Sequence, residues 1–192
     1  SLQSAINFLG FSCKVSSNPK EITSAKKLLL PGVGAYKSAM ASLEGKGISE
    51  AIKNSVAKEG NQILGICLGM QVMADSGLEH GKTKGLGLLE GQIEAMKPTR
   101  KHKVPHIGFN EVQTNPESKL FRDIPNHSDF YFVHSYQLVS PPRVGLSAYT
   151  TYENTFVAAY ESKNVFATQF HPEKSQSNGL KVLQNFLEIP NA

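Results

Sequence analysis

The stretch Ile63-Leu64-Gly65-Ile66-Cys67-Leu68-Gly69-Met70-Gln71 predicts a short buried strand that turns sharply into a helix. Cys67 stands at the turn, with one glycine two residues before it and another two residues after it. This arrangement is typical of a nucleophile elbow, here with cysteine in place of serine. The turn forces the nucleophile into a strained backbone conformation, and the glycines leave room for the neighbouring backbone. We therefore expect the Cys67 side chain to stand exposed at the carboxyl end of the sheet.

Cys67 has a plainer alternative, because most free cysteines are small buried hydrophobic residues. The flanking glycines and the strand-to-helix context favour a nucleophile whose thiolate the helix dipole would stabilise. In that case the backbone N–H of Leu68 would point toward an oxyanion. Cys13 lacks such a context, and we interpret it as a strand residue without chemistry.

A cysteine nucleophile needs a base, and the base needs an orienting group. His171-Pro172-Glu173 follows a strand-like run at 165–170. Residues two apart face the same side of an extended chain, so His171 and Glu173 can both point to one site. By itself this tripeptide would more often be a surface loop with an incidental ion pair. Together with Cys67 it predicts a nucleophile, its base and the group that orients the base.

A second glycine-rich segment, Pro31-Gly32-Val33-Gly34, follows a short apolar run at 27–30. Its backbone amides could supply another donor to an oxyanion. The segment lacks the spacing and the lysine of a phosphate-binding loop, so nucleotide binding has weak support. The alternative is a tight turn with a positive φ, which glycine permits.

Around these motifs the chain changes character between its two halves. The first half alternates strands at 12–16, 27–30 and 61–66 with helices at 35–43, 48–58 and 68–74. Such alternation predicts a parallel sheet covered on both faces. Residues 86–170 are mostly strand-like, and 179–187 form a closing amphipathic pattern. Because no linker divides the halves, we expect a single domain over 1–192.

The composition indicates a folded protein and limits its partners. Of the 192 residues, 40% are hydrophobic and 19% charged, which excludes a largely disordered chain. No apolar run approaches the roughly 20 residues of a membrane span, and no signal peptide is visible. Two cysteines cannot build a disulfide framework, so we expect a cytoplasmic protein with reduced thiols.

Charge and histidine spacing give no sign of nucleic acid, membrane or metal. The net charge is +4, and the densest basic stretch, 97–103, has no interleaved aromatic residue. A solvated loop is favoured there over a docking edge for an acidic partner, and no nucleic-acid partner is expected. The six histidines show no ligand spacing, so we expect neither a metal nor another cofactor.

Taken together, the three motifs resemble those of the class I, triad-type glutamine amidotransferases. The resemblance covers nearly the whole chain, and the combination is specific although each motif alone is not. It implies a flavodoxin-like parallel α/β sheet with flanking helices and a β-rich second half. It also implies hydrolysis of glutamine to glutamate and ammonia, with the ammonia handed to a synthase.

Within that family the chain is most similar to the glutaminase subunits of imidazole glycerol phosphate synthases, which serve histidine biosynthesis. The segments that carry this similarity are 31–36, 105–110, 131–136 and 171–175. The most specific is 105–110, which usually reads Pro-His-Met-Gly-Trp-Asn and here has Ile107 and Phe109. The resemblance implies a heterodimer with the synthase (cyclase) subunit.

The resemblance also implies roles for individual residues. Cys67 would form a glutamyl thioester, His171 would act as general base and then acid, and Glu173 would orient it. The oxyanion hole would be formed by Val33, Gly34 and Leu68. The amino-acid end of glutamine would be held by Gln71, Glu79, Ser135 and Tyr136. The synthase would be faced by Pro105, His106, Asn110, Tyr131 and Lys174.

Two of these residues have plainer alternatives. Glu79 would otherwise be a solvated acidic residue in the loop at 77–81, and Tyr131 a strand residue that packs in the core. Docking itself has a chemical reason, because ammonia released into neutral water is mostly protonated and cannot attack. Partner binding could also complete the oxyanion hole by flipping a peptide at Val33-Gly34.

Members of this family begin with a hydrophobic strand ahead of the helix that starts here at Ser1. We therefore expect a domain that lacks its first strand, with an exposed sheet edge.

Three alternatives to a glutaminase subunit of imidazole glycerol phosphate synthase remain open. The chain could be a paralogous subunit that serves another synthase, such as one amidating a surface sugar. It could be a truncated, non-catalytic binding subunit, or a cysteine hydrolase acting alone, which 105–110 disfavours.

Overall fold

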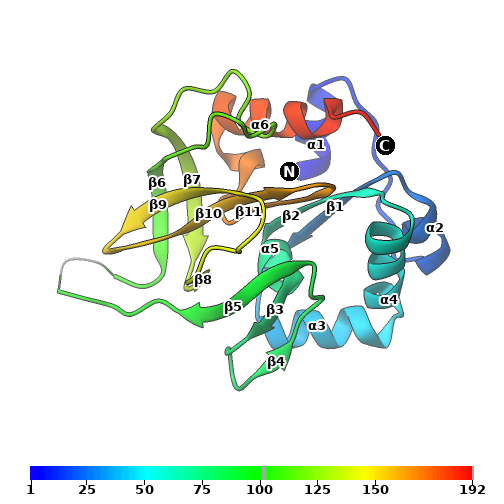
Figure 1. Cartoon of the computed structure of the whole chain (residues 1–192), viewed down its shortest axis with the longest axis horizontal. Coiled ribbons are helices and arrows are strands. Elements are labelled where there is room, and N and C mark those ends of the chain that lie inside the picture. Colours follow the sequence, from blue (N-terminus) through cyan, green and yellow to red (C-terminus); the bar gives the residue numbers. More distant parts are fainter. Residues whose placement is uncertain (101–102, 192) are drawn as a thin grey trace.

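The computed structural model describes residues 1–100 and 103–191, and a five-stranded sheet lies at its centre (Figure 1). The strands lie in the order β1 (Lys27–Gly32), β2 (Gln62–Cys67), β11 (Val165–Thr168), β10 (Asn154–Ser162) and β9 (Leu146–Tyr152). The first three are parallel, and β10 and β9 continue the sheet antiparallel. The predicted α/β fold with a parallel sheet is confirmed.

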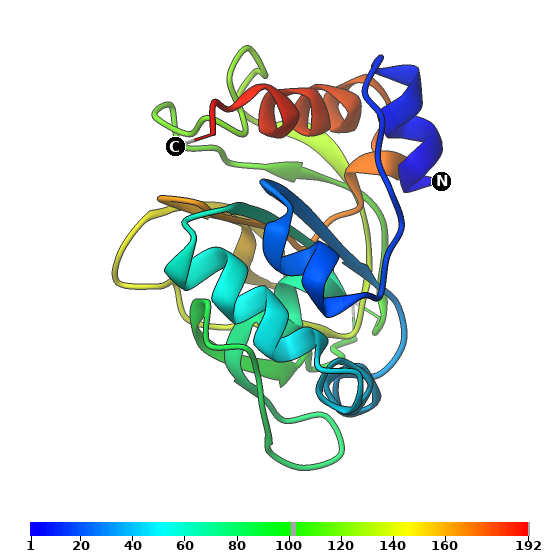
Figure 2. The same ribbon diagram turned by 90° about the vertical axis from the view of Figure 1, so that its right-hand side faces the viewer.

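Helices cover both faces of this sheet (Figure 2). One face carries α1 (Leu2–Phe8) and α6 (Gln176–Glu188). The other carries α2 (Pro19–Ser24), α3 (Tyr36–Gly45), α4 (Ile48–Lys53), the π-helical turn η1 (Asn54–Lys58) and α5 (Leu68–Met73). The central strand β2 is buried along its whole length, as expected for a parallel strand covered on both sides. Its Ile63 side chain packs into one core and its Leu64 and Ile66 side chains into the other.

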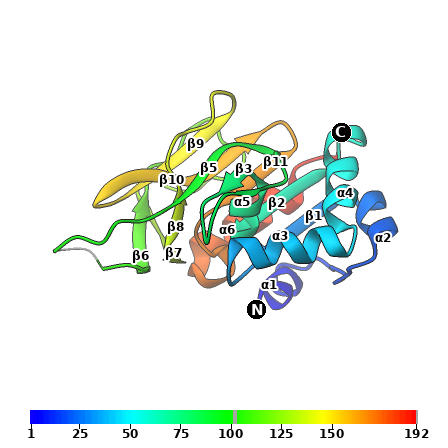
Figure 3. The same cartoon turned by 90° about the horizontal axis from the view of Figure 1, so that it is seen from below.

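The β-rich second half adds two smaller sheets. The first has the order β4 (Thr83–Lys84), β3 (Ala74–Gly77), β5 (Leu89–Ala95) and β8 (Tyr136–Leu138). The second is the antiparallel pair β6 (His106–Val112) and β7 (Ser128–His134). Figures 1 and 3 show that this pair stands at the opposite end of the molecule from α2 and α4.

The predicted strand at 12–16 is wrong, because residues 11–18 form neither helix nor strand. Side chains of this segment bind the first turn of α2 instead of a sheet. Lys14 Nζ lies 2.7 Å from Glu21 Oε1, and Ser16 Oγ donates to Glu21 Oε2 at 2.5 Å. Cys13 therefore lies in an irregular segment.

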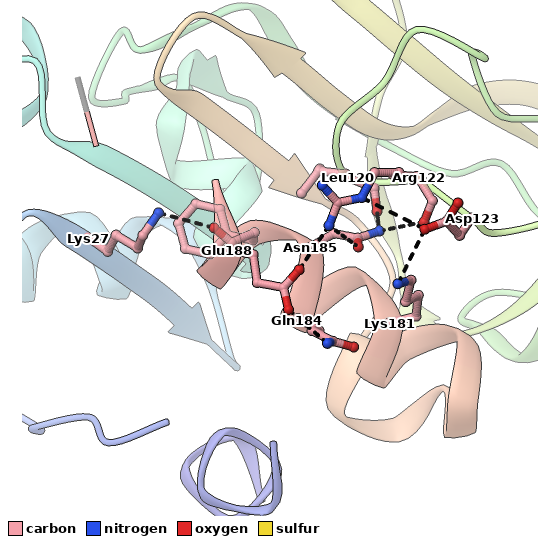
Figure 4. A network of polar contacts seen from close by, with 9 residues as sticks. Lys27, Leu120, Arg122, Asp123, Lys181, Gln184, Asn185 and Glu188 are labelled. Carbon is pink, nitrogen blue, oxygen red and sulfur yellow. Dashed lines mark hydrogen bonds and ion pairs between the residues drawn. The ribbon is translucent and has the colours of Figure 1, made fainter. Parts of the chain in front are cut away.

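Polar contacts fix α6 between β1 and the loop before β7 (Figure 4). Lys27 Nζ on β1 donates to the carbonyl oxygen of Phe186 at 3.2 Å, which also accepts from the N–H of Ile189 at 3.3 Å at the end of the helix. Asn185 Nδ2 donates to the carbonyl oxygens of Leu120 at 2.9 Å and Arg122 at 2.8 Å. These bonds hold the last turns of α6 against the sheet that carries the site.

The first turn of α5 passes so close to the sheet that two positions accept only glycine. A Cβ atom on Gly69 would lie 1.6 Å from the carbonyl oxygen of Leu30 on β1. A Cβ atom on Gly65 would lie 2.4 Å from the sulfur of Met73 and 2.9 Å from backbone atoms of α5. The sequence pattern predicted that these glycines leave space for the neighbouring backbone. The close packing of α5 requires that space at both positions.

Replacement of Gly69 by alanine should destabilise the protein by about 3 kcal/mol or more, because the added methyl group meets backbone that cannot move independently. The free energy of unfolding in urea measures this. Gly45→Ala is the matched control, since nothing lies within 4 Å of its Cβ position at the end of α3. The control should change the free energy by less than about 1 kcal/mol. Equal losses in the two variants would contradict the packing argument.

Candidate active site

Cys67 ends β2 and precedes the first turn of α5, with φ of 54° and ψ of −110°. A non-glycine residue in this region of backbone space is strained, and the flanking packing holds it there. The strained elbow that the sequence predicted is confirmed. Its sulfur is placed at the carboxyl end of the parallel strands, where sites of open α/β sheets form.

The predicted exposure of Cys67 is wrong, because only 7% of the residue is accessible. Two residues from the second half of the chain cover its sulfur. The carbonyl oxygen of Val133 at the end of β7 lies 3.9 Å away and can accept from the thiol. Gln169, just after β11, places its side-chain Nε2 3.8 Å away. The sequence reasoning did not identify Gln169.

His171 and Glu173 are brought together as predicted, although the backbone takes a different path. The imidazole Nδ1 lies 2.8 Å from Glu173 Oε1, and 5% and 8% of the two side chains are accessible. The chain is not extended here, because Pro172–Lys174 forms the 3₁₀ turn η2. The contact survives because a single 3₁₀ turn carries the Glu173 side chain back toward His171.

Ser175 joins the His171 turn to β7. The backbone N–H of His171 donates to the carbonyl oxygen of Tyr131 at 2.9 Å. Ser175 Oγ donates to the carbonyl oxygen of His171 at 2.6 Å and accepts from the N–H of Tyr131 at 2.9 Å. Strand β7 therefore sets the position of the imidazole, a role that the sequence reasoning did not assign to Ser175.

The surroundings of His171 make its imidazole a strong base. Burial lowers the pKa of His171, but the neighbouring Cys67 sulfur and the Glu173 carboxylate outweigh this and raise it to about 9. Burial raises the pKa of Glu173, but its hydrogen bond and charge interaction with His171 bring it below the usual value. The two groups therefore form an ion pair at neutral pH.

The nitrogen that would take the thiol proton is held ready but not engaged. His171 Nε2 is buried and has no hydrogen-bond partner among residues 1–100 and 103–191. Although Nε2 has no hydrogen-bond partner there, the nearby Cys67 sulfur contributes to the raised pKa of the imidazole. Catalytic hydrogen bonds are often long in free enzymes and tighten when substrate binds.

The predicted oxyanion donors lie on two adjacent segments. Gly32, at the end of β1, is the register partner of Cys67 on β2. The loop that follows Gly32 carries Val33, whose side chain is 85% exposed, and Gly34, whose φ is 102°. Leu68 is the first residue of α5 and is buried. The structure therefore brings the loop at 33–34 and the amide of Leu68 to the same end of the sheet as the sulfur.

Two of the residues predicted to hold glutamine already have partners in this structure. Gln71 is buried, and its Nε2 donates to the carbonyl oxygen of Tyr136 at 2.9 Å. Glu79 Oε2 accepts from the backbone N–H of Tyr36 at 2.6 Å, which places a carboxylate at the first turn of α3. Glu79 is half-buried in the loop after β3, so it is not simply a solvated loop residue. Ser135 and Tyr136 are half-buried.

The prediction that His106 faces a partner is wrong, because only 2% of this residue is accessible. Its ring stacks on Tyr152 with the ring centres 4.0 Å apart, and its Nδ1 lies 3.1 Å from His134 Nε2. His134 Nδ1 donates to a carbonyl oxygen, so its Nε2 must accept from His106. Burial lowers the pKa of His134 to about 3, which keeps that ring uncharged.

The side-chain alternation of β6 explains why His106 points inward. Burial alternates along the strand, and this places Ile107 and Phe109 on the outside with 60% and 49% of each residue accessible. Asn110 is half-buried and donates to the carbonyl oxygen of Thr151 at 3.0 Å. Of the other residues predicted to face the synthase, Pro105 and Lys174 are exposed and Tyr131 is half-buried.

Within 1–100 and 103–191, no three or more His, Cys, Asp or Glu side chains cluster as a metal ion would require. The helices of the same residues include none long and apolar enough to cross a membrane. Residues 101 and 102 of the predicted basic stretch lie outside the described residues.

The family model described as glutamine amidotransferase class-I matches residues 1–189. The chain belongs to this family. Two curated relatives are subunits of imidazole glycerol phosphate synthase. HisH 1 of Campylobacter jejuni (strain RM1221) is 44% identical over 185 residues, which cover 96% of this chain and 89% of that protein. HisH of Moorella thermoacetica (strain ATCC 39073 / JCM 9320) is 43% identical over 189 residues, which cover 98% and 89%.

Solved structures share the fold at lower identity. A crystal structure of a glutamine amidotransferase superposes with a TM-score of 0.73 and 17% identity, covering 97% of this chain and 90% of that one. A glutamine amidotransferase from Thermotoga maritima gives a TM-score of 0.65 and 18% identity, covering 97% of this chain and 74% of that one. The predicted fold class is confirmed.

The His171–Glu173 pair should make stability depend on pH. The folded pKa of His171 is raised from 6.5 to about 9, so its contribution is fully present below about pH 6.5 and is lost as the pH rises to about 9. Glu173→Gln removes the carboxylate partner and should flatten this slope. We expect the difference to be roughly 1 to 3 kcal/mol in free energy of unfolding, measured in urea between pH 6.5 and 9.

The matched control is Glu44→Gln, an exposed carboxylate on α3, which should leave the slope unchanged. A slope in Glu173→Gln equal to that of the unaltered protein would show that the pair does not hold the His171 proton.

Proposed function

We propose that this protein is the glutaminase subunit of imidazole glycerol phosphate synthase, which hydrolyses glutamine and passes the ammonia to the synthase subunit. The observation that carries the proposal is the strained Cys67 elbow beside the buried His171–Glu173 pair. A nucleophile, a base and its orienter are the groups that amide hydrolysis through an acyl-enzyme requires. The names of relatives at 43–44% identity supply the particular synthase.

The chemistry follows from these groups. The proton of the Cys67 thiol passes to His171, whose raised pKa holds it at neutral pH, and the Cys67 thiolate attacks the carboxamide carbon of glutamine. The resulting oxyanion accepts from the N–H of Leu68 and from the loop at 33–34. When the C–N bond breaks, His171 returns the proton to the departing nitrogen, and ammonia leaves a glutamyl thioester. Water then attacks the thioester, gives a proton to His171, and releases glutamate and the free thiol.

The substrate end of the site follows the same proposal. Glu79 would receive the α-ammonium group of glutamine, with Ser135 and Tyr136 against the α-carboxylate. Glu79 also accepts from the N–H of Tyr36 directly after the oxyanion loop. A carboxylate has two oxygens and can serve both groups at once.

The exposed outer face of the β6–β7 pair is the surface we assign to the synthase subunit. Phe109 and Tyr131 are register partners on these strands, and their rings meet edge-on with centres 5.5 Å apart. Lys174 Nζ lies 5.9 Å from the centre of the Tyr131 ring. Ile107 extends the apolar surface beside them. Because Tyr131 also binds the His171 backbone, a partner on this face would lie next to the active site.

A partner at this place would keep ammonia out of bulk water, where protonation would remove its nucleophilic lone pair. The mechanism further requires Cys67 to stay reduced, and this agrees with action in the cytoplasm. We treat residues 1–192 as one domain, since both helical faces pack on a single central sheet.

Glutamate release from glutamine should rise at least tenfold when the synthase subunit is added together with its nucleotide ligand, because docking completes and closes the site. Cys67→Ala should abolish release in both mixtures, and serves as the blank. A Cys67-dependent rate that the synthase subunit does not change would point to a paralogue serving another synthase. A folded protein without activity in either mixture would favour a non-catalytic binding subunit.

The outer face of β6 can be tested separately by binding. Phe109→Asp should raise the dissociation constant for the synthase subunit about tenfold or more, because it places a charge within an apolar contact. Val15→Asp is the matched control, since Val15 is 80% exposed in the segment that leads into α2. Helix α2 stands at the opposite end of the molecule from β6 (Figure 1). Equal affinities in the two variants, measured by calorimetry, would place the interface elsewhere.

A further inference from the structure

A buried side-chain amide lies against the sulfur of Cys67, and the mechanism above does not use it. Gln169 follows β11, two residues before His171, and is wholly inaccessible to solvent. Its backbone N–H donates to the carbonyl oxygen of Ala158 at 2.8 Å, which fixes the residue to β10. Its side-chain Nε2 lies 3.8 Å from Cys67 Sγ. A buried amide needs partners, and here one partner is the nucleophile itself.

The surrounding groups decide which end of the Gln169 amide faces the sulfur. The carbonyl oxygen of Tyr136 can only accept, and it receives a hydrogen bond from Gln71 Nε2 at 2.9 Å. The same nitrogen of Gln71 lies 3.1 Å from Gln169 Oε1. Rotating the Gln71 amide would place its oxygen against two acceptor oxygens, and rotating the Gln169 amide would bring two NH₂ groups together. Gln169 is thereby held with its NH₂ group toward Cys67.

The sulfur therefore has two neighbours of opposite polarity. The carbonyl oxygen of Val133, 3.9 Å away, can accept from the neutral thiol. It would repel a thiolate, which has no hydrogen to donate. Gln169 Nε2 can donate to a thiolate, and a hydrogen bond to a charged acceptor is about twice as strong as one between neutral groups. As the proton leaves, the favourable contact passes from Val133 to Gln169.

We propose that Gln169 is a further catalytic residue, whose side-chain amide holds the Cys67 thiolate in place for attack. Gln71 is a positioning residue that acts through Gln169 by fixing the direction of its amide. The catalytic role of Gln169 rests on the proposed function. The contact with the sulfur is independent of the substrate.

The direct test is the rate at which iodoacetamide alkylates Cys67 at pH 7, because the thiolate is the reacting form. The reagent needs neither glutamine nor a synthase subunit, and Cys13→Ser in all proteins removes the other thiol. Gln169→Met keeps the length of the side chain and removes its donor. We expect alkylation to slow about tenfold or more, and Gln169→Glu, which turns a carboxylate toward the sulfur, to slow it further.

Gln71→Met should slow alkylation less than Gln169→Met, because it frees the amide without removing it. Gln62→Met is the matched control. Gln62 is also a buried glutamine near the sheet, but its amide binds Pro190 at 2.6 Å, away from the site. This control should alkylate at the rate of the parent protein. Thermal unfolding establishes that each variant is folded, and Gln169→Glu keeps the shape of the parent residue should Gln169→Met fail to fold.

Steady-state glutaminase kinetics separate this role from substrate binding. We expect kcat to fall about tenfold or more in Gln169→Met, with KM nearly unchanged. A folded Gln169→Met or Gln169→Glu variant that alkylates at the parent rate would overturn the proposal, as would a change confined to KM. If alkylation depends on Gln169 in a protein that releases no glutamate, the proposed function fails and the role of Gln169 stands.

Discussion

The site depends on how closely the first turn of α5 approaches β1. Gly69 lies directly against the carbonyl oxygen of Leu30, and this contact leaves the chain no gradual route from β2 into α5. The bend is concentrated at Cys67, whose φ of 54° is the local cost of the close packing. The same bend brings the amide of Leu68 and the loop after β1 to the end of the sheet where the sulfur lies.

The second half of the chain supplies the base, its orienting group and the residues that cover this sulfur. β7 provides Val133 above the sulfur and the backbone of Tyr131, to which the His171 turn is bound. The segment after β11 provides Gln169 and His171. Strands β2 and β11 are hydrogen-bonded neighbours, so residues far apart in sequence are held in one rigid frame. A packed sheet gives a precision that flexible loops would not.

The elements that sequence predicted well are those that local rules determine. The elbow at Cys67 follows from glycine spacing and a short apolar strand. The contact of His171 with Glu173 was predicted from their spacing, although a 3₁₀ turn and not an extended chain makes it. The burial of Cys67 was not predictable in this way, since it depends on which distant strands cover the sulfur. Gln169 and Ser175 carry no local signal of their roles, because their partners lie on other elements.

The sequence predictions that the structure contradicts also failed for physical reasons. His106 belongs to a motif that suggested partner contact, but aromatic stacking and a hydrogen bond to His134 hold it inside. Ile107 and Phe109 of β6 are left outside as a result, although hydropathy alone would place them inside. The segment at 12–16 has a strand-like pattern, but Glu21 on α2 binds its polar side chains. In each case a tertiary contact outweighed the local pattern.

The pairing of β2 with β11 also has a consequence for how the protein folds. Ile63 pairs with Val165, so the centre of the sheet closes only across a very long loop. Long-range pairing of this kind slows folding, and during synthesis the first half leaves the ribosome well before its central neighbour exists. Until β11 arrives, the cysteine has neither its base nor its cover. The cysteine therefore gains its base and its contact with Gln169 only when nearly the whole chain is in place, so the chemistry of the site appears at the end of synthesis.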